Sequence, residues 1–347
     1  MKRHLLFLAA LLIVNLAASA QKKFSVYAVG FYNQENLFDT CHDEGKKDYE
    51  YLPNKGWNGM KYTNKLRNMS KALADMGTDV LPNVGCAFIG LSEVENHKVL
   101  DALVDQAPLK ARNMKYVHIE GPDRRGIDCA LLYNPSLFSV KNVKLLPYVQ
   151  ELAKDSAFFT RGFLTVRGEM AGDDVAVIVC HWPSRFSGPF YRESAARQVK
   201  VIKDSLLNVN QEMKIFVMGD MNDDPVNKSM HVYLQAKPEI GQVGAGDMYN
   251  PWYNVLAKEG KGTLFYSGNW NLFDQIVITP NLLNKDAKKK DYSSLKYWKS
   301  HIFRRDYLIQ QEGQYKGAPL RTTAGGRWLN GYSDHLPVVM YLVKEKK

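Results

Sequence analysis

The sequence predicts an α/β protein built from mixed β-sheets with helices on the outside. Many short apolar runs of the kind found in strands follow one another along the chain, and few helical patterns separate them. A purely doubly wound sheet would instead alternate strand and helix regularly. No internal repeat or low-complexity linker divides the sequence, which favours one large domain. The runs expected to form strands are residues 24–32, 87–91, 116–119, 129–133, 138–146, 164–167, 175–180, 215–218, 273–278 and 338–343.

Apolar residues spaced three or four apart predict three helices. The first is expected to begin at Thr63-Asn64, whose side chains can cap it, and to end before Gly77. The other two are expected over residues 97–104 and 193–207.

Residues 1–20 have the features of a secretory signal peptide. A basic start precedes an apolar stretch over residues 5–18, and small residues follow at positions 18–20. A membrane anchor is the alternative, but the stretch is shorter than the roughly 20 residues that span a bilayer. We therefore expect cleavage before Gln21, export to the periplasm or the medium, no stable membrane insertion, and one mature domain over residues 21–347.

The 347-residue chain is basic, with a formal net charge of +10. A basic surface attracts polyanions such as nucleic acid or phospholipid head groups, although the same charge can serve solubility alone. Between residues 285 and 305, basic and aromatic residues are interleaved. That mixture can hold a phosphate backbone and stack bases, but it is also common in solvated loops. The four cysteines lack the spacing of a zinc site and are too few for a disulfide framework.

Two polar segments beside apolar runs carry the strongest functional signal. Residues 219–222 (Gly-Asp-Met-Asn) follow one run, and residues 333–335 (Ser-Asp-His) precede another. Acids, amides and imidazoles at strand ends are where α/β enzymes place their chemistry. Asp220 can take a proton from an attacking water, and Asn222 can donate to phosphate oxygens. Together such groups suit a hard divalent cation and a phosphate ester.

Further polar residues follow other expected strands. Asn33 and Glu35 are two residues apart and would share a face of a continuing strand, where they can bind a cation or form a turn. Glu93 emerges from a buried run and is the expected principal metal ligand. An acid just inside a buried strand needs a partner. We therefore expect Asp128 to orient His181 and keep it protonated, unless His181 only ends its strand.

Two acids and two arginines complete the candidate set. Asp274 begins an apolar run and can support a second histidine, His335. Asp334 is then free to help bind metal. Arg185 and Arg197 could clamp a phosphate of the substrate, although an arginine on this expected helix can equally be surface decoration.

In order and spacing, these residues resemble the endonuclease/exonuclease/phosphatase superfamily of DNase I-like enzymes. The motifs extend from about residue 31 to residue 343. The resemblance implies a four-layer α/β sandwich in which two mixed β-sheets pack face to face, with the site at one edge. It also implies dependence on Mg²⁺ or Mn²⁺ and hydrolysis of phosphodiesters or phosphomonoesters.

The resemblance also implies roles for individual residues. His335 resembles the histidine that contacts the scissile phosphate, and His181 matches a position that is histidine in the DNase-like branch. The implied metal positions are Glu93, with Asn33, Glu35 and Asp334 nearby, and the implied catalytic positions are His181, Asp220, Asn222, Asp274 and His335.

The natural substrate stays open at this point. Export, basic charge and the histidine at position 181 favour an endonuclease that cleaves the phosphodiester bonds of nucleic acid by direct attack of an activated water. The oligomeric state is not readable from the sequence, and a monomer is the default expectation. A phosphatase, or a phospholipid or sphingomyelin phosphodiesterase of the same fold, is the alternative. A binding protein that has lost catalysis is a further alternative, but the complete set of polar residues argues against it.

Overall fold

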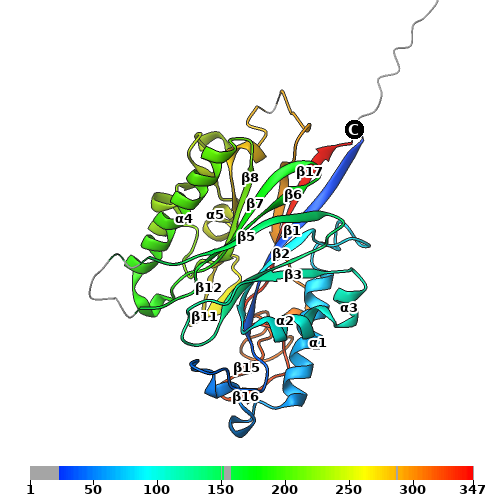
Figure 1. Ribbon diagram of the computed structural model, residues 1–347, viewed down its shortest axis with the longest axis vertical. Coiled ribbons are helices and arrows are strands. Elements are labelled where there is room, and N and C mark those ends of the chain that lie inside the picture. Colours follow the sequence, from blue (N-terminus) through cyan, green and yellow to red (C-terminus); the bar gives the residue numbers. More distant parts are fainter. Residues whose placement is uncertain (1–22, 150, 152–157, 287, 347) are drawn as a thin grey trace, which may run out of the picture.

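Two mixed β-sheets stack face to face, and helices cover their outer faces (Figure 1). This computed structural model describes residues 23–149, 151, 158–286 and 288–346. The arrangement confirms the expected four-layer α/β sandwich.

The first sheet has six strands in the order β14-β17-β1-β2-β4-β3. β1 and β2 run parallel, and the other neighbours run antiparallel. The earliest and latest strands of the described chain, β1 and β17, therefore lie side by side within this sheet. The strands are β1 (Phe24–Leu37), β2 (Phe88–Val94), β3 (Lys115–His118), β4 (Asp128–Tyr133), β14 (Lys296–Ile302) and β17 (Val338–Glu345).

The second sheet has seven strands in the order β5-β6-β7-β8-β13-β10-β9. β7 and β8 run parallel, and β13 returns antiparallel to β8. Two short hairpins, β11–β12 and β15–β16, lie outside both sheets. The bounds are β5 (Phe138–Leu146), β6 (Phe163–Met170), β7 (Asp173–His181), β8 (Lys214–Asp220), β9 (Ala236–Lys237), β10 (Met248–Tyr249), β11 (Leu264–Tyr266), β12 (Asn269–Asn271), β13 (Asp274–Ile278), β15 (Thr323–Ala324) and β16 (Arg327–Trp328).

Alternation along the strands builds the core between the sheets. Val29 and Phe31 of β1 belong to the apolar cluster between the two sheets, whereas Tyr32 belongs to the cluster under the helices. Successive side chains of a strand point to opposite faces, so both faces of β1 are buried. Across the sheet interface, the rings of Phe88 and Phe216 lie 5.6 Å apart.

The helices pack on the outer faces of the sheets. α1 begins at Gly59 rather than at Thr63, because the side chain of Asn58 accepts a hydrogen bond from the backbone N–H of Lys61 and caps the helix there. α1, α2 and α3 cover the first sheet, and α4 covers the second. The bounds are α1 (Gly59–Asp75), α2 (His97–Val104), α3 (Ala107–Lys110), α4 (Pro189–Val209) and α5 (Trp252–Ala257).

Strand direction brings the functional segments to one edge of the sandwich. β1, β2, β7 and β8 end at this edge, and β13 begins there. Asp274 is therefore opposite Asp220 in the antiparallel pair of β13 and β8. His181 is next to Asp220 because β7 and β8 are parallel and in register.

The amino-terminal segment is not part of this description. The expected signal peptide, residues 1–20, lies outside the described residues. Within residues 23–149, 151, 158–286 and 288–346, no helix combines the length and the apolar character needed to cross a bilayer.

Candidate active site

The strand ends at this edge carry an unusual backbone conformation. Glu35, Asn36, Glu93 and Asn222 have φ angles of 45°, 56°, 60° and 50°. Such left-handed angles are costly for residues other than glycine and cluster at functional sites. The register between β1 and β2 also shifts after Asn33, so β1 does not simply continue its alternation there. The bulge, rather than period-two spacing, sets the directions of Asn33 and Glu35.

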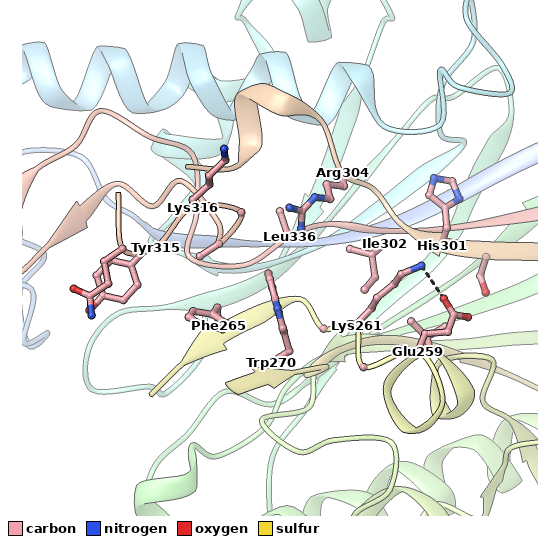
Figure 2. Close-up of a pocket in the computed structure, with 17 residues that line it drawn as sticks. Glu259, Lys261, Phe265, Trp270, His301, Ile302, Arg304, Tyr315, Lys316 and Leu336 are labelled. Carbon is pink, nitrogen blue, oxygen red and sulfur yellow. Dashed lines mark hydrogen bonds and ion pairs between the residues drawn. The ribbon is translucent and has the colours of Figure 1, made fainter. Parts of the chain in front are cut away.

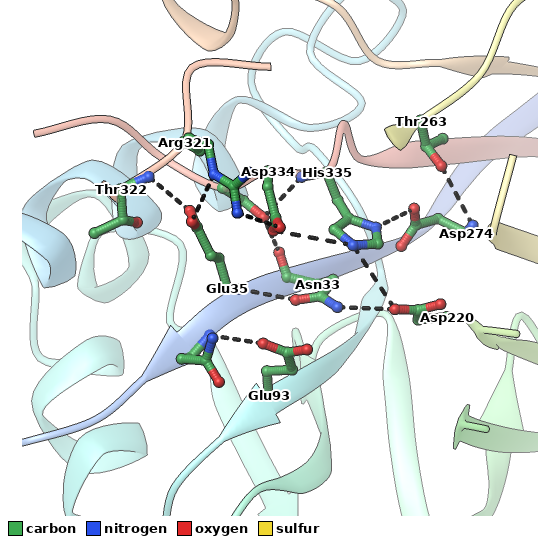
Figure 3. Close-up of polar contacts among 12 residues, drawn as sticks. Asn33, Glu35, Glu93, Asp220, Thr263, Asp274, Arg321, Thr322, Asp334 and His335 are labelled. Carbon is green, nitrogen blue, oxygen red and sulfur yellow. Dashed lines mark hydrogen bonds and ion pairs between the residues drawn. The ribbon is translucent and has the colours of Figure 1, made fainter. Parts of the chain in front are cut away.

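His335 and Asp274 form a buried pair at the centre of the site (Figure 3). The Nδ1 atom of His335 lies 2.7 Å from Oδ2 of Asp274. Burial works against a charged ring, but the carboxylates of Asp274 and Asp220 outweigh it and raise the pKa of His335 well above its ordinary value. His335 is therefore protonated at neutral pH and can donate from Nε2. The expected contact between Asp274 and the ring of His335 is therefore present.

Asp220 faces His335 from the end of β8. Its Oδ2 atom lies 3.8 Å from Nε2 of His335 and accepts a hydrogen bond from Nδ2 of Asn33 at 3.0 Å. Its Oδ1 atom accepts from the backbone N–H of Asn222 at 2.9 Å. Burial, only partly offset by His335, raises the pKa of Asp220 to about 7. A carboxylate with that pKa can exchange a proton with water near neutrality.

Asn222 is held in place through its amide. Nδ2 donates one hydrogen bond to the backbone carbonyl of Trp182 at 2.9 Å. A primary amide has two N–H groups, so this contact leaves one donor for a phosphate oxygen.

His181 lies between the carboxylates of Asp220 and Glu93. Its Nε2 atom lies 3.7 Å from Oδ2 of Asp220 and 3.8 Å from Oε1 of Glu93. Its buried Nδ1 atom has no hydrogen-bond partner among the described residues. Burial, together with Arg161 and Arg125, lowers the pKa of His181 well below its ordinary value. The ring is neutral here, contrary to the expectation that a carboxylate keeps it protonated.

The expected pairing of Asp128 with His181 is wrong. Oδ2 of Asp128 lies 3.0 Å from Nε2 of His118, and Oδ1 accepts from the backbone N–H of Gly121 at 3.0 Å. The reason is topological: β4, which Asp128 begins, pairs with β3, which ends at His118, whereas His181 ends a strand of the other sheet.

Glu93 has an oxygen available to a cation. Its Oε2 atom accepts from the backbone N–H of Asn36 at 2.9 Å. No hydrogen bond to its Oε1 atom is found within the part of the chain that the structure describes, and the side chain keeps 14% of its exposure. A carboxylate oxygen with room for water is the type of ligand that Mg²⁺ or Mn²⁺ takes. Glu93 therefore fits its expected place as the principal ligand.

Glu35 and Asp334 are joined by an arginine that the sequence did not suggest. Arg321 lies 3.4 Å from Oε1 of Glu35 and 3.0 Å from Oδ2 of Asp334 (Figure 3). The backbone N–H of Thr322 also donates to Glu35 at 2.6 Å. Both acids lie beside Asn33 and Glu93, as expected, but Arg321 already occupies them. A cation at Glu93 would meet these two acids only through water or after Arg321 moves.

A buried lysine stands behind this group. Lys65 of α1 donates to the hydroxyl of Thr322 and to the carbonyl of Tyr332, both at 2.5 Å. Burial lowers the pKa of Lys65 to about 8 and raises the pKa of Glu35 to about 7. Lys65 lies among apolar helix positions in the sequence, so only the fold identifies it.

The two arginines expected to bind phosphate have other partners. Arg185 lies at the rim of the site, where it pairs with Asp224 at 2.9 Å and stands over the ring of Phe273 at 4.5 Å. Arg197 is on α4 and pairs with Glu151 at 2.5 Å, over the ring of Tyr233. Arg197 of α4 thus has an acidic and an aromatic partner, and its expected contact with a substrate phosphate stays a prediction.

Arg125, which was not among the expected site residues, reaches the catalytic edge. Its Nη2 atom donates to Oδ1 of Asn36 at 2.6 Å, directly beside Glu93. It belongs to the segment Arg124-Arg125-Gly126, which is visible in the sequence before the acid at position 128. Only the loop between β3 and β4 reveals that it reaches the catalytic edge.

The first part of the basic and aromatic stretch over residues 285–305 lies away from this edge. It forms the loop before β14, at the opposite end of the molecule from β15 and β16 (Figure 1). Lys285 and Lys296 donate to the backbone carbonyls of Val243 and Asn281. These lysines therefore stabilise the fold and do not line the site.

Comparisons with known proteins agree with this geometry. A family model described as "Endonuclease/Exonuclease/phosphatase family" matches residues 28–344. No curated protein matches the sequence. Among solved structures, an endonuclease/exonuclease/phosphatase family protein from Bacteroides thetaiotaomicron is similar, with 14% identity, a TM-score of 0.55, and coverage of 93% of this chain and 97% of that one.

Two further solved structures are similar in fold. One is D. rerio TDP2 complexed with a single-strand DNA product, at 11% identity and a TM-score of 0.53, covering 92% of this chain and 99% of that one. The other is a mannosyl-6-phosphatase of Bacteroides thetaiotaomicron VPI-5482, at 14% identity and a TM-score of 0.54, covering 91% and 99%. At these identities the similarity concerns the fold.

Replacing Asp274 should change the titration of His335. Asp274→Asn keeps the shape but removes the strongest charge that favours the protonated ring, so the pKa of His335 should fall by at least about one unit, or about 1.4 kcal/mol. NMR titration of the ring nitrogens measures this. Asp79→Asn is the matched control, because Asp79 lies 3.4 Å from another histidine, His301. An unchanged pKa of His335 in Asp274→Asn would contradict the assignment.

Divalent cations should stabilise the protein more at pH 8 than at pH 6.5. Burial raises the pKa values of Glu35 and Asp220 to about 7 and of Glu95 to about 8, above those of the unfolded chain. The folded state then loses more protons than the unfolded state over this range, so the metal-free protein becomes less stable as pH rises. A cation at the carboxylates offsets this cost.

Thermal unfolding at pH 6.5 and pH 8 tests this prediction. The protein is measured with about 5–10 mM Mg²⁺ or Mn²⁺, and with EDTA and NaCl at the same ionic strength as the reference. A rise in Tm that is equal at both pH values, or absent at both, would contradict a carboxylate-bound cation.

Proposed function

The chain belongs to the endonuclease/exonuclease/phosphatase family, and from that premise we propose that it is an exported, Mg²⁺- or Mn²⁺-dependent phosphodiesterase acting on nucleic acid. One observation carries the proposal. Oε1 of Glu93 and Oδ2 of Asp220 both lie within 3.8 Å of Nε2 of His181, and the same Asp220 oxygen lies 3.8 Å from Nε2 of His335. A metal ligand, a base and two imidazoles thus converge at one point of this edge, as hydrolysis of a phosphate ester requires.

Each side chain has a defined task in hydrolysis. Asp220 accepts a proton from the attacking water, because its pKa lies near neutrality. Protonated His335 donates to a phosphate oxygen, and Asp274 holds the ring in orientation. Asn222 donates its remaining amide N–H to another oxygen, and neutral His181 can donate one further N–H.

The residues present fit a divalent cation at Glu93. The donor set of Glu93, with Asn33, Glu35 and Asp334 nearby, consists of oxygens that suit Mg²⁺ or Mn²⁺. A bound cation would supply charge neutralisation at the phosphate and the leaving oxygen. Arg321 holds two of these acids in the structure described here, so Glu93 is the ligand whose loss should matter most.

A pocket beside the catalytic edge contains two lysines that a polyanionic substrate could use. It has a volume of about 260 Å³, and its lining includes Lys55 and Lys61 together with the acids Glu35 and Glu50. Neither lysine forms an ion pair with an acid in the described ranges of the chain, although Lys61 stands 5.6 Å from the ring of Trp328. A second phosphate next to the scissile one would meet these two ammonium groups.

The bound DNA product of D. rerio TDP2 is consistent with a nucleic-acid substrate in this fold. A phosphatase is the second candidate, favoured by the similarity to a mannosyl-6-phosphatase and by Arg125 and Arg321 at the site, which suit the extra charge of a phosphomonoester. Export rests on residues 1–20, whose basic, apolar and small-residue regions are those of a signal peptide.

Hydrolysis of bis-p-nitrophenyl phosphate tests the catalytic proposal. The purified protein should release p-nitrophenol with Mg²⁺ or Mn²⁺ and stop with EDTA. Glu93→Gln should reduce turnover by about 10²–10³-fold without unfolding the protein. Glu169→Gln, an exposed acid paired with Lys141, is the control and should keep full activity. Wild-type activity of Glu93→Gln at saturating Mg²⁺ would remove the metal assignment.

A substrate panel separates the candidates. Plasmid nicking that exceeds the release of phosphate from phosphomonoesters supports the nuclease, and the reverse supports a phosphatase. Sphingomyelin and phospholipid hydrolysis test the lipid alternative. A protein that cleaves none of these esters with either metal would be a binding protein.

The lysine pocket predicts a dependence on chain length. Lys55→Ala/Lys61→Ala should leave bis-p-nitrophenyl phosphate hydrolysis unchanged but lower kcat/KM on oligonucleotides by about tenfold, since each contact to a phosphate contributes about 1 kcal/mol or less when exposed. Lys289→Ala/Lys290→Ala, two exposed lysines in the loop before β14, is the matched control. An equal loss in both double variants would indicate a general charge effect instead of a defined contact.

A further inference from the structure

A second cleft lies beside the β11–β12 hairpin, whose Leu264 forms an isolated β-bridge with His335. Its volume is about 540 Å³, and its walls come from the β11–β12 hairpin, the edge strand β14 and the segment 314–318 (Figure 2). Gly262 and Leu336 line this cleft. Their neighbours Thr263 and His335 belong to the catalytic edge. The two sites are therefore close in the fold but separated by the hairpin.

The cleft has an excess of positive charge. Its basic groups include Lys261, which pairs with Glu259 at 2.8 Å, and His301, which lies 3.4 Å from Asp79. Arg304 and Lys316 are the remaining cations of the lining. Both are exposed, and neither has an acidic partner among the residues that the structure describes. These two groups could bind an anion without displacing an existing ion pair.

One wall of the cleft is aromatic. The rings of Phe265 and Trp270 lie 5.2 Å apart across the hairpin, and both face the cleft below Arg304 (Figure 2). Tyr315 lies at the outer end and is 52% exposed. Partly exposed aromatic faces beside unpaired cations are the combination that binds a flat ring linked to a phosphate.

We propose that this cleft is a binding site for a mononucleotide-sized ligand, with its base against Trp270 and its phosphate at Arg304 and Lys316. The volume lies within the range of pockets for small molecules and exceeds what a single phosphate needs. The aromatic wall favours a ligand with a ring over a simple anion, and the two unpaired cations favour a phosphorylated ligand over an uncharged nucleoside. The site is independent of the proposed catalytic function, because none of its binding groups belongs to the catalytic edge.

Equilibrium binding to the purified protein in EDTA tests the proposal, since hydrolysis needs a divalent cation under the function proposed above. The probes are 5′-AMP, adenosine, ribose 5-phosphate and inorganic phosphate, measured by titration calorimetry. We expect AMP to bind at least about tenfold more tightly than each of the other three, because only AMP uses both walls. Equal affinity for AMP and inorganic phosphate would overturn the role of the aromatic wall.

Variants assign the two walls separately. Trp270→Ala should weaken AMP about tenfold or more but leave ribose 5-phosphate unchanged. Arg304 is exposed, so Arg304→Glu should not disturb folding. This variant should weaken the binding of AMP and of ribose 5-phosphate and leave the binding of adenosine unchanged. Trp298→Ala is the matched control, because Trp298 is an exposed tryptophan of β14 beside Lys299 and outside the cleft.

Arg125→Ala distinguishes this cleft from the catalytic edge. Arg125 lies beside Asn36 and Glu93, so AMP bound there would be weakened by its loss. Affinity that falls in Arg125→Ala but persists in Arg304→Glu would overturn the proposal. Failure of the catalytic proposal would show instead as absent ester hydrolysis, whatever the cleft binds.

Discussion

The buried pair of Asp274 and His335 is the interaction on which the architecture of the site depends. Asp274 begins β13 of the second sheet, and His335 lies just before β17 of the first. A second polar link, from Asn33 to Asp220, also joins the first sheet to the second. The face-to-face sheets are apolar at their centre, and at this edge the catalytic groups themselves provide polar contacts between the two sides of the sandwich.

The site combines this link with an excess of buried negative charge. Burial favours the protonated forms of Glu35 and Asp220. Lys65 and Arg321 offset this only in part at Glu35, and His335 only in part at Asp220. Left-handed backbone at Glu35, Glu93 and elsewhere adds conformational cost. Both features raise the free energy of the site when no ligand is bound. Binding of a cation and an anionic ester would lower it, as is common in preorganised catalytic sites.

The sequence predicted ten strands of the two sheets and the residues that end them, but not β14 of the first sheet or the short strands β9 and β10 of the second. Apolar runs ending in Glu93, Asp220 or His181 identify the edge because strand termini are local features. The pairing of Asp128 could not be predicted, because its partner depends on which strands are neighbours within a sheet. The contacts of Arg321 with Glu35 and Asp334 likewise depend on tertiary packing.

The pairing of β17 with β1 has a consequence for how the chain folds. β1 needs β17 as its antiparallel neighbour, and the two strands lie at opposite ends of the described sequence. Contacts between such distant segments form late, because the intervening chain must be available first. During ribosomal synthesis the first sheet therefore stays open until the last strand emerges.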